Sequence, residues 1–256
     1  MLAILYETAA VADAEIRKLM RDPTEVFSRA VQPVLWLAVF GQVFSKVRGI
    51  PTGSLRYLDY MAPGILAQSI LFSAIFYGIA IIWERDLGIV HKLLVTPAHR
   101  SALVLGKATA AGLRGLVQAI VVYLVAIALD VHIRWAPLPM LTVAAAVFLG
   151  SCVFATFSLV IACIVKTRER FMGIGQVLTM PLFFASNAIY PLELMPPWLK
   201  TAATFNPLTY LVDALRGAMI VEGQSVYPYA TSFGVLLLAF AVLLALASRL
   251  YPGLAR

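Results

Sequence analysis

Six runs of apolar residues, each close to the length of a membrane-spanning helix, dominate the sequence. They cover approximately residues 30–44, 61–83, 103–129, 138–165, 171–190 and 229–247. A helix needs about 20 mostly apolar residues to cross the hydrocarbon core of a bilayer, although Pro33 and Pro181 interrupt the first and fifth runs. The short alternating segments that build membrane barrels do not occur in the sequence. The pattern therefore predicts an all-α membrane protein with six transmembrane helices.

The first 29 residues show a different pattern. Apolar residues recur there at helical spacing between charged residues, which is typical of an amphipathic helix that lies along a membrane surface. Pro23 interrupts the pattern and predicts two short helices. No uninterrupted apolar run precedes a small-residue cleavage site, so we expect no cleavable signal peptide. We expect a cytoplasmic interfacial helix here, and a separate binding element is the alternative.

Composition excludes a soluble protein. Of the 256 residues, 61% are hydrophobic and 13% are charged, whereas a soluble domain is about half apolar and about a quarter charged. Lipid must therefore be the main solvent of the chain. We expect one transmembrane domain over residues 1–256, with the interfacial helix at 1–29, the spans within 30–248 and a cytoplasmic tail at 249–256.

The formal charge of +7 would suggest nucleic acid as the partner of a soluble protein. If the N-terminus lies inside, however, thirteen Lys and Arg residues fall on inner segments and six on outer segments. The positive-inside rule then places both termini in the cytoplasm. We expect a multi-pass protein of a bacterial-type inner membrane, in contact with lipid and not with nucleic acid.

Residues 84–100, between the second and third runs, look too ordered for a simple connector. Leu87, Val90 and Leu94 form one apolar face, which predicts a short cytoplasmic helix along the membrane surface. Pro97 disfavours helix at Thr96 and starts the return into the bilayer. Spacing alone leaves open whether this segment is a solvated loop or a docking helix for another protein.

Residues 191–223, between the fifth and sixth runs, predict short helices that re-enter the outer leaflet. Asn206 followed by Pro207 is typical of a helix N-cap with proline in the first helical position. These helices could form an outer lid over a pathway or a structural cap. The candidate residues of this segment are Glu193, Pro196, Trp198, Asn206, Pro207, Tyr210, Asp213 and Arg216.

Arg114 stands inside the third run, where a cation costs about 2.5 to 3.5 kcal/mol on insertion scales. It shares a helical face with Lys107 and Gln118. Two interpretations stay open: Arg114 snorkels or forms a structural pair, or Arg114 and Gln118 line a pathway. Five aromatic residues could line a cavity for a flat apolar substrate, with ordinary packing as the alternative. They are Phe72, Phe76, Tyr77, Phe183 and Phe184.

The sequence contains few features that would support catalysis by this chain. The three histidines, His91, His99 and His132, form no metal-binding motif, and no GxSxG nucleophile elbow occurs. Gly106-Lys107 is not a P-loop, because Ser101 stands where glycine is needed and Ala108 where Ser or Thr is needed. We therefore expect no metal or cofactor on this chain, and another polypeptide must hydrolyse ATP if ATP drives its work.

Several motifs, in this order, resemble a known family. They are ERDLG at 84–88, LLVTP at 93–97 followed by Arg100, PLELMPPWL at 191–199 and NPLTYLVDALRG at 206–217. The chain resembles, over nearly its whole length, the ABC-2 type permeases, the membrane subunits of ATP-binding-cassette exporters. It is most similar to the drug-resistance (daunorubicin-type) and nodulation-factor export branch.

The resemblance implies a dimer of permeases, either a homodimer or a pair with a paralogue, that works with two copies of a separate cytoplasmic ATPase, which binds ATP and Mg²⁺. The implied ATPase-coupling residues are Glu84, Arg85, Asp86, Leu87, His91, Lys92, Leu94, Thr96, Pro97 and Arg100. We expect export of a hydrophobic or amphipathic compound, a drug or a lipid-like molecule. Polysaccharide or lipid-linked glycan export is the alternative, although the aromatic residues look scattered for a sugar pathway. A non-transporting membrane anchor and an intramembrane enzyme are further alternatives.

Overall fold

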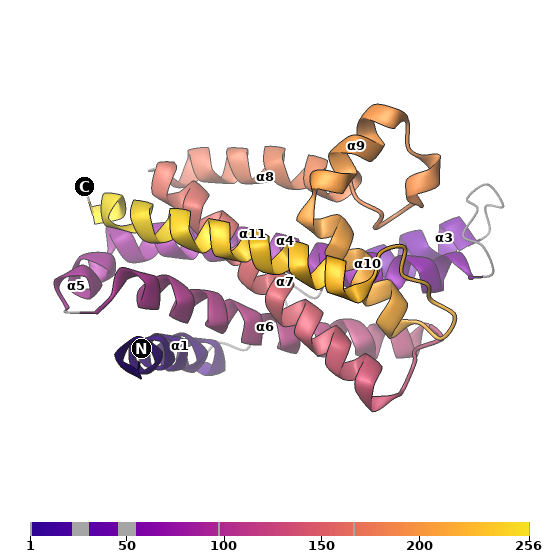
Figure 1. The fold of residues 1–256 in the computed structure, drawn as a ribbon, viewed down its shortest axis with the longest axis horizontal. Coiled ribbons are helices and arrows are strands. Elements are labelled where there is room, and N and C mark those ends of the chain that lie inside the picture. The colour runs from indigo at the N-terminus through magenta and orange to yellow at the C-terminus, as the bar shows by residue number, and fades with distance from the viewer. Residues whose placement is uncertain (1, 22–30, 46–54, 97, 166, 256) are drawn as a thin grey trace.

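The computed structural model describes residues 2–21, 31–45, 55–96, 98–165 and 167–255. Within these ranges the chain is all-helical (Figure 1), and its only extended pairing is an isolated antiparallel bridge between Ile133 and Ile220. The predicted helical fold class is thereby confirmed for the described residues.

Four helices of the described residues are long and apolar enough to cross a membrane. They are α4 (Tyr57–Asp86), α6 (Arg100–Ala128), α7 (Pro137–Ile164) and α11 (Tyr229–Leu250), which the turn η3 (Tyr251–Ala255) continues. They lie lengthwise in one bundle (Figure 1), with α7 packed against the other three. The chain is therefore a multi-pass membrane protein.

The two remaining predicted spans are shorter. Within the described residues, the first is an apolar helix, Val31–Phe44, that contains the π-helix η1 (Trp36–Gly41) and overlaps α3 (Gln42–Ser45). The fifth is α8 (Arg168–Phe184), which has 17 residues. It begins at charged residues and ends soon after Pro181, where the chain turns. Four of the six predicted spans are confirmed by length and hydropathy.

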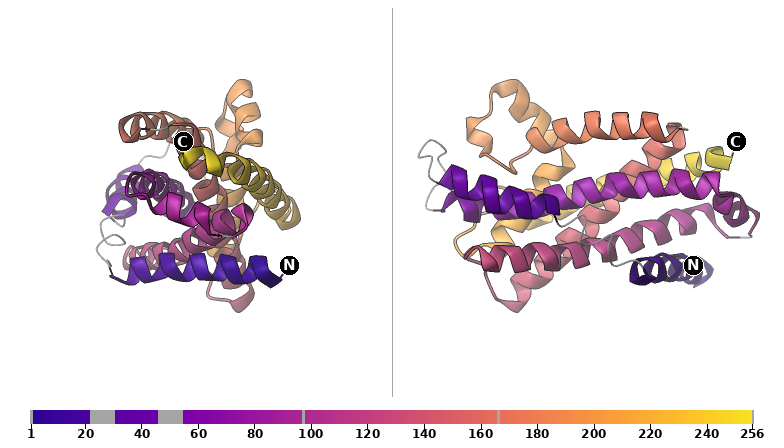
Figure 2. Two further views of the ribbon diagram at one scale, coloured as in Figure 1. Left: turned by 90° about the vertical axis from the view of Figure 1, so that its left-hand side faces the viewer. Right: turned by 180° about the vertical axis from the view of Figure 1, so that it is seen from behind.

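The N-terminal segment forms one helix, α1 (Leu2–Arg21), that lies across the bundle and packs against α6. Figure 2 shows α1 nearly perpendicular to the long helices. The break predicted at Pro23 falls outside the described residues.

The two ends of the bundle differ, and we name them by the helices that they carry. The α5 end holds α5 (Ile89–Val95), the last turns of α4 and the first turns of α6. The α10 end holds η2 (Leu192–Leu194), α9 (Pro197–Phe205) and α10 (Pro207–Met219).

Helix α10 begins as predicted. The Asn206 side chain accepts a hydrogen bond from the backbone N–H of Leu208, and Pro207 occupies the first helical position. The helix is buried from Leu208 to Met219 because α4, α7 and α11 surround it. It is therefore an internal element of the α10 end.

Candidate functional site

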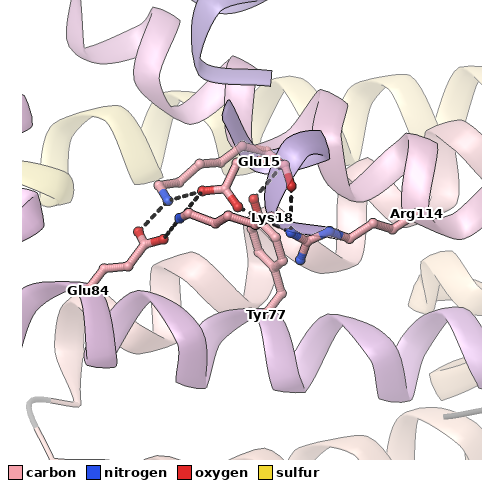
Figure 3. Close-up of polar contacts among 6 residues, drawn as sticks. Glu15, Lys18, Tyr77, Glu84 and Arg114 are labelled. Atoms are coloured by element: carbon pink, nitrogen blue, oxygen red, sulfur yellow. Dashed lines mark hydrogen bonds and ion pairs between the residues drawn. The ribbon is translucent and has the colours of Figure 1, made fainter. Parts of the chain in front are cut away.

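Five charged side chains from three helices meet near the α5 end (Figure 3), and we call them the ionic cluster: Glu15 and Lys18 on α1, Glu84 on α4, and Lys107 and Arg114 on α6. Lys107 Nζ lies 2.6 Å from Glu84 Oε2 and 3.0 Å from Glu15 Oε1. Lys18 Nζ also reaches both carboxylates, at 2.5 Å and 3.3 Å. Arg114 NH2 lies 3.2 Å from Glu15 Oε2. The cluster therefore joins α1 to α4 and α6.

Residue spacing explains why these groups meet. Lys107 and Arg114 are seven residues apart, which is about two helical turns, so they lie on one face of α6. Tyr77 and Glu84 have the same spacing on α4. Glu84 binds Lys107, the Tyr77 hydroxyl donates to the Lys107 carbonyl at 2.9 Å, and the Arg114 guanidinium lies 5.3 Å from the centre of the Tyr77 ring. One face of α4 and one face of α6 therefore contact each other at two levels, two helical turns apart.

The cluster is mostly buried. The Lys107 side chain is 3% exposed and Glu15 is 8% exposed, whereas Lys18 is 51% exposed. Burial opposes ionisation of Glu15, but the charges of Lys107, Lys18 and Arg114 hold the pKa of its carboxyl below the ordinary value. Among the described residues two carboxylates face three cations, and α1 supplies one of these carboxylates, Glu15, to Lys107 and Arg114 of α6.

Two further contacts hold α1 against α6. The His99 backbone N–H donates to Glu7 Oε2 at 2.9 Å, and this bond lowers the pKa of Glu7. At Gly106 the helices touch so closely that an added Cβ would lie 2.5 Å from the Val11 Cβ and 2.9 Å from the Thr8 carbonyl oxygen. Helix α1 is therefore fixed at three points along its length.

The expected coupling residues divide into inward and outward groups. Glu84 points into the ionic cluster, and Asp86 lies 2.7 Å from Arg85 and 2.6 Å from Arg168 of α8. The carboxylates of Glu84 and Asp86 therefore form ion pairs with basic residues of the same chain.

The outward group forms an exposed surface on and beside α5. Leu87 is 67% exposed and Val95 is 88% exposed, while Val90 is buried beneath them and Leu94 is partly buried. Gly88 adopts a φ of 73°, which lets the chain turn sharply from α4 into α5. Four polar residues of this surface are exposed: His91, Lys92, Thr96 and Arg100. Pro97 lies outside the described residues.

Three of the candidate pathway residues meet in one place. Tyr77, Arg114 and Gln118 line a cavity of about 20 Å³ between α4, α6 and α7, which suffices for about one water molecule. A second cavity, between α4, α7 and α8, measures about 10 Å³. Drug-sized ligands occupy pockets of roughly 300–1,000 Å³, so neither cavity admits such a molecule.

The other aromatic candidates lie away from this cavity. Phe72 and Phe76 are on α4, where Phe72 is partly buried and Phe76 is about half exposed. Phe183 and Phe184 start a continuous series of ring contacts with centroids 4.5 to 6.3 Å apart. The series runs through Phe184, Phe183, Trp36, Phe40, Phe44 and Tyr57. The expectation of scattered aromatic residues is wrong for this set, because α8, α4 and the helix of residues 31–44 bring them together.

At the α10 end, Asp213 organises the chain that follows α10. Its buried carboxylate accepts hydrogen bonds from the Ser225 hydroxyl at 2.6 Å and from the backbone N–H groups of Val226 and Tyr227 at 2.8 and 3.0 Å. Asp213 therefore has a structural role in this state.

Arg216 and Asn206 brace the turn that follows α8. Arg216 donates to the Asn187 carbonyl at 2.6 Å and lies 3.8 Å from the centre of the Tyr60 ring. The Asn206 amide donates to the carbonyls of Leu182 and Ala185. The Tyr210 hydroxyl donates to the Thr204 carbonyl. By contrast, Glu193, Pro196 and Trp198 are exposed.

The sequence pattern did not single out Glu15 and Lys18, which supply the α1 side of the cluster. A signal was present: two cations two turns apart within an apolar run demand acidic partners, and the flanking segments offer several acids, including Glu15 and Glu84. The pattern could not say which of them folds back onto α6.

Comparisons with known proteins agree with these features. Residues 6–220 match the sequence model of the ABC-2 type transporter family. A protein named as a transport permease, ycf38, of Cyanophora paradoxa is 30% identical over 202 residues, which cover 78% of this chain and 69% of that protein. A protein named as a doxorubicin resistance ABC transporter permease, DrrC, of Mycobacterium tuberculosis (strain CDC 1551 / Oshkosh) is 26% identical, over 77% of this chain and 71% of its own. Nodulation protein J of Rhizobium leguminosarum bv. trifolii is 25% identical, over 74% of this chain and 71% of its own.

Proposed function

The chain belongs to the ABC-2 type transporter family and is a permease subunit of such a transporter, and from this premise we propose that it exports a hydrophobic or amphipathic compound. In this family a separate subunit hydrolyses ATP. We expect two copies of that ATPase, with their ATP and Mg²⁺, to work with two copies of this chain in a bacterial-type inner membrane.

The proposed orientation places the α5 end in the cytoplasm. Both chain termini then lie inside, the helix of residues 31–44 and α8 complete six passes, and α1 lies along the inner surface. The excess of Lys and Arg on inner segments supports this orientation.

The observation that carries the proposal is the rigid link between the α5 surface and the bundle. Helix α5 lies between α4 and α6 in the chain, and the Glu84–Lys107 ion pair joins the end of α4 to the early part of α6. A push on Leu87 or Val95 would therefore move α4, α6 and α1 together, as a lever requires. We propose that the ATPase docks on this surface. Glu84 does not contact the ATPase in this proposal; its ion pair with Lys107 transmits the movement from α4 to α6.

The proposed transport path lies outside the single chain, because the cavities between α4, α6, α7 and α8 are too small for a substrate. A path between two copies of the chain, or between the chain and lipid, remains. Arg114 and Gln118 would then move with the helices and would not line the whole path of the substrate.

The proposed substrate class follows from the aromatic series. Phe40 and Phe184 are 42% and 45% exposed, and the exposed neighbours Leu35, Val39 and Val43 are apolar. A flat apolar compound could stack on such rings. A sugar could stack on them too, but its hydroxyl groups would need polar partners, which these apolar neighbours do not offer. The name of DrrC refers to doxorubicin resistance, and we propose a drug or lipid-like compound over the glycan alternative.

The docking proposal is tested by placing charges on the α5 surface. Leu87→Asp with Val95→Asp should abolish co-purification of the ATPase in mild detergent, because both side chains are exposed and lie outside the ionic cluster. Leu194→Asp, a 49% exposed leucine at the α10 end, is the matched control. Undiminished ATPase recovery with the double variant would contradict docking at α5.

A further inference from the structure

A second group of charges lies at the α10 end and contains a histidine. Asp59, on the first turn of α4, has a side chain that is 3% exposed. Its carboxylate accepts hydrogen bonds from Arg56 Nε at 3.0 Å and Arg56 NH2 at 3.2 Å. It also receives the His132 backbone N–H at 3.0 Å, and its Oδ2 lies 3.0 Å from His132 Nδ1. We call the Asp59–His132 contact the junction.

The junction joins three parts of the chain. His132 belongs to the connection between α6 and α7, and its carbonyl accepts the backbone N–H of Val221, just after α10, at 3.0 Å. Two residues further along, the backbone N–H of Arg134 donates to the Met219 carbonyl at 2.8 Å. Asp59 therefore ties the start of α4, through His132, to the α6–α7 connection and the end of α10.

Protons from solution can reach the junction. The His132 side chain is 60% exposed, and it lines a cavity of about 230 Å³ together with Arg56, Asp59 and Glu222. An ionised carboxylate cannot donate a hydrogen bond, so Nδ1 must carry the proton that faces Asp59, which leaves Nε2 as the second protonation site. Histidine is the side chain that ordinarily changes charge between about pH 5 and pH 8.

Charged groups of both signs surround the imidazole ring at the junction. Among the residues that the structure describes, five ionisable groups lie on the elements packed around His132: Asp59, Asp130, Glu222, Arg56 and Arg134. Three are acidic and two are basic, so their formal sum is −1 before His132 is counted. An imidazolium neutralises this sum and adds an ionic attraction to a hydrogen bond that the neutral ring already makes.

We propose that His132 is a proton-operated latch: its protonation strengthens the junction and holds the α6–α7 connection against α4 and α10. Acid therefore favours the latched state, because the added charge lies beside the Asp59 carboxylate. Only the location of the latch on the outer face rests on the proposed function. If that end opens to release substrate, acid outside the cell slows the opening.

Hydrogen exchange in lipid nanodiscs tests the latch without a substrate or an ATPase. The amides of Arg134 and Val221 should exchange up to about fivefold more slowly at about pH 6 than at about pH 8, after correction for intrinsic exchange, because an exposed ion pair is worth at most about 1 kcal/mol. His132→Gln keeps a side-chain donor for Asp59 but cannot titrate, so this difference should vanish. The Leu129 amide, which bonds to the Val125 carbonyl within α6, is the control.

Equal corrected protection of the two amides at both pH values would overturn the latch, and so would an unchanged pH effect in His132→Gln. Nitrogen-15 spectra of histidine-labelled wild-type protein give a second measurement without a substitution. They should show His132 with Nδ1 protonated throughout and Nε2 titrating, and a ring that never titrates between about pH 5 and pH 8 would also overturn the proposal. Loss of ATPase binding at the α5 surface, by contrast, would contradict the proposed function and leave this result untouched.

Discussion

At the scale of single residues, Lys107 has the most demanding position, because its ammonium group binds two carboxylates while its side chain is only 3% exposed. A buried ion pair adds little net stability, but removing one partner leaves the other charge without its compensation. Lys107 therefore holds α1 and α4 in one relative position, because its ammonium group binds Glu15 of α1 and Glu84 of α4.

Lys107→Met should lower the free energy of unfolding by about 3 kcal/mol, because Glu84 loses its buried partner. Adding Glu84→Gln should recover part of this loss, since the Glu84 carboxylate would otherwise rely on the half-exposed Lys18. Thermal unfolding of the single and double variants in nanodiscs measures the coupling. Strictly additive effects would show that the two side chains do not act as a pair.

Glu15 predicts a particular dependence on pH. Its folded pKa is lowered, so its ionised form stabilises the fold above the unfolded pKa of about 4.3, and this contribution is lost as the pH falls through the folded value. Glu15→Gln should be less stable than wild type at neutral pH and should lose less stability on acidification. Unfolding temperatures from about pH 3 to pH 7 give the comparison.

The control for Glu15 is Asp13→Asn, because Asp13 and its partner Arg17 are 59% and 72% exposed. An exposed pair contributes little, so this variant should follow the wild-type curve. If Glu15→Gln also follows the wild-type curve, the carboxylate of Glu15 does not stabilise the fold through its charge.

At the scale of elements, apolar periodicity predicted the long helices well, and α4, α6, α7 and α11 all lie within or around predicted runs. It did less well where helix length depends on tertiary contacts. Helix α8 ends at Phe184, and the Asn206 amide donates hydrogen bonds to the carbonyls of Leu182 and Ala185 at this end. This contact joins segments about 20 residues apart, so no local pattern records it.

Gly106→Ala should loosen α1, because the new methyl group would meet Val11 and the Thr8 backbone at less than 3 Å. The matched control is Gly173→Ala on α8, where nothing lies within 4 Å of an added Cβ. Alanine is favoured over glycine within a helix by roughly 0.5–1 kcal/mol, so the control should be neutral or more stable.

Limited trypsin digestion at Arg17 and Lys18, together with unfolding temperature, distinguishes these two variants. Faster cleavage of Gly106→Ala alone is expected. Equal cleavage rates in the two variants would show that close packing at Gly106 does not hold α1 in place.

At the scale of the whole molecule, the sequence predicted a helical membrane domain and named most of the α4–α6 residues that gather at the α5 end. It could not predict that Glu84 turns inward while Leu87 and Val95 face outward. That division depends on α1 crossing α6 and offering Glu15 and Lys18 to the same charges. Within the described residues, Leu87 and Val95 of the α5 surface stay exposed, and the Glu84–Lys107 pair joins α4 to α6 beside it.

The central claim is that a separate ATPase moves this permease through the α5 surface. Its most direct test places a photo-crosslinking amino acid at Val95 in the native membrane, with the same group at Trp198 on α9 as the control. The account predicts that position 95 captures a P-loop ATPase, identified by mass, and that position 198 does not. Capture of the ATPase at position 198 alone, or at neither position in membranes that contain it, would contradict the account.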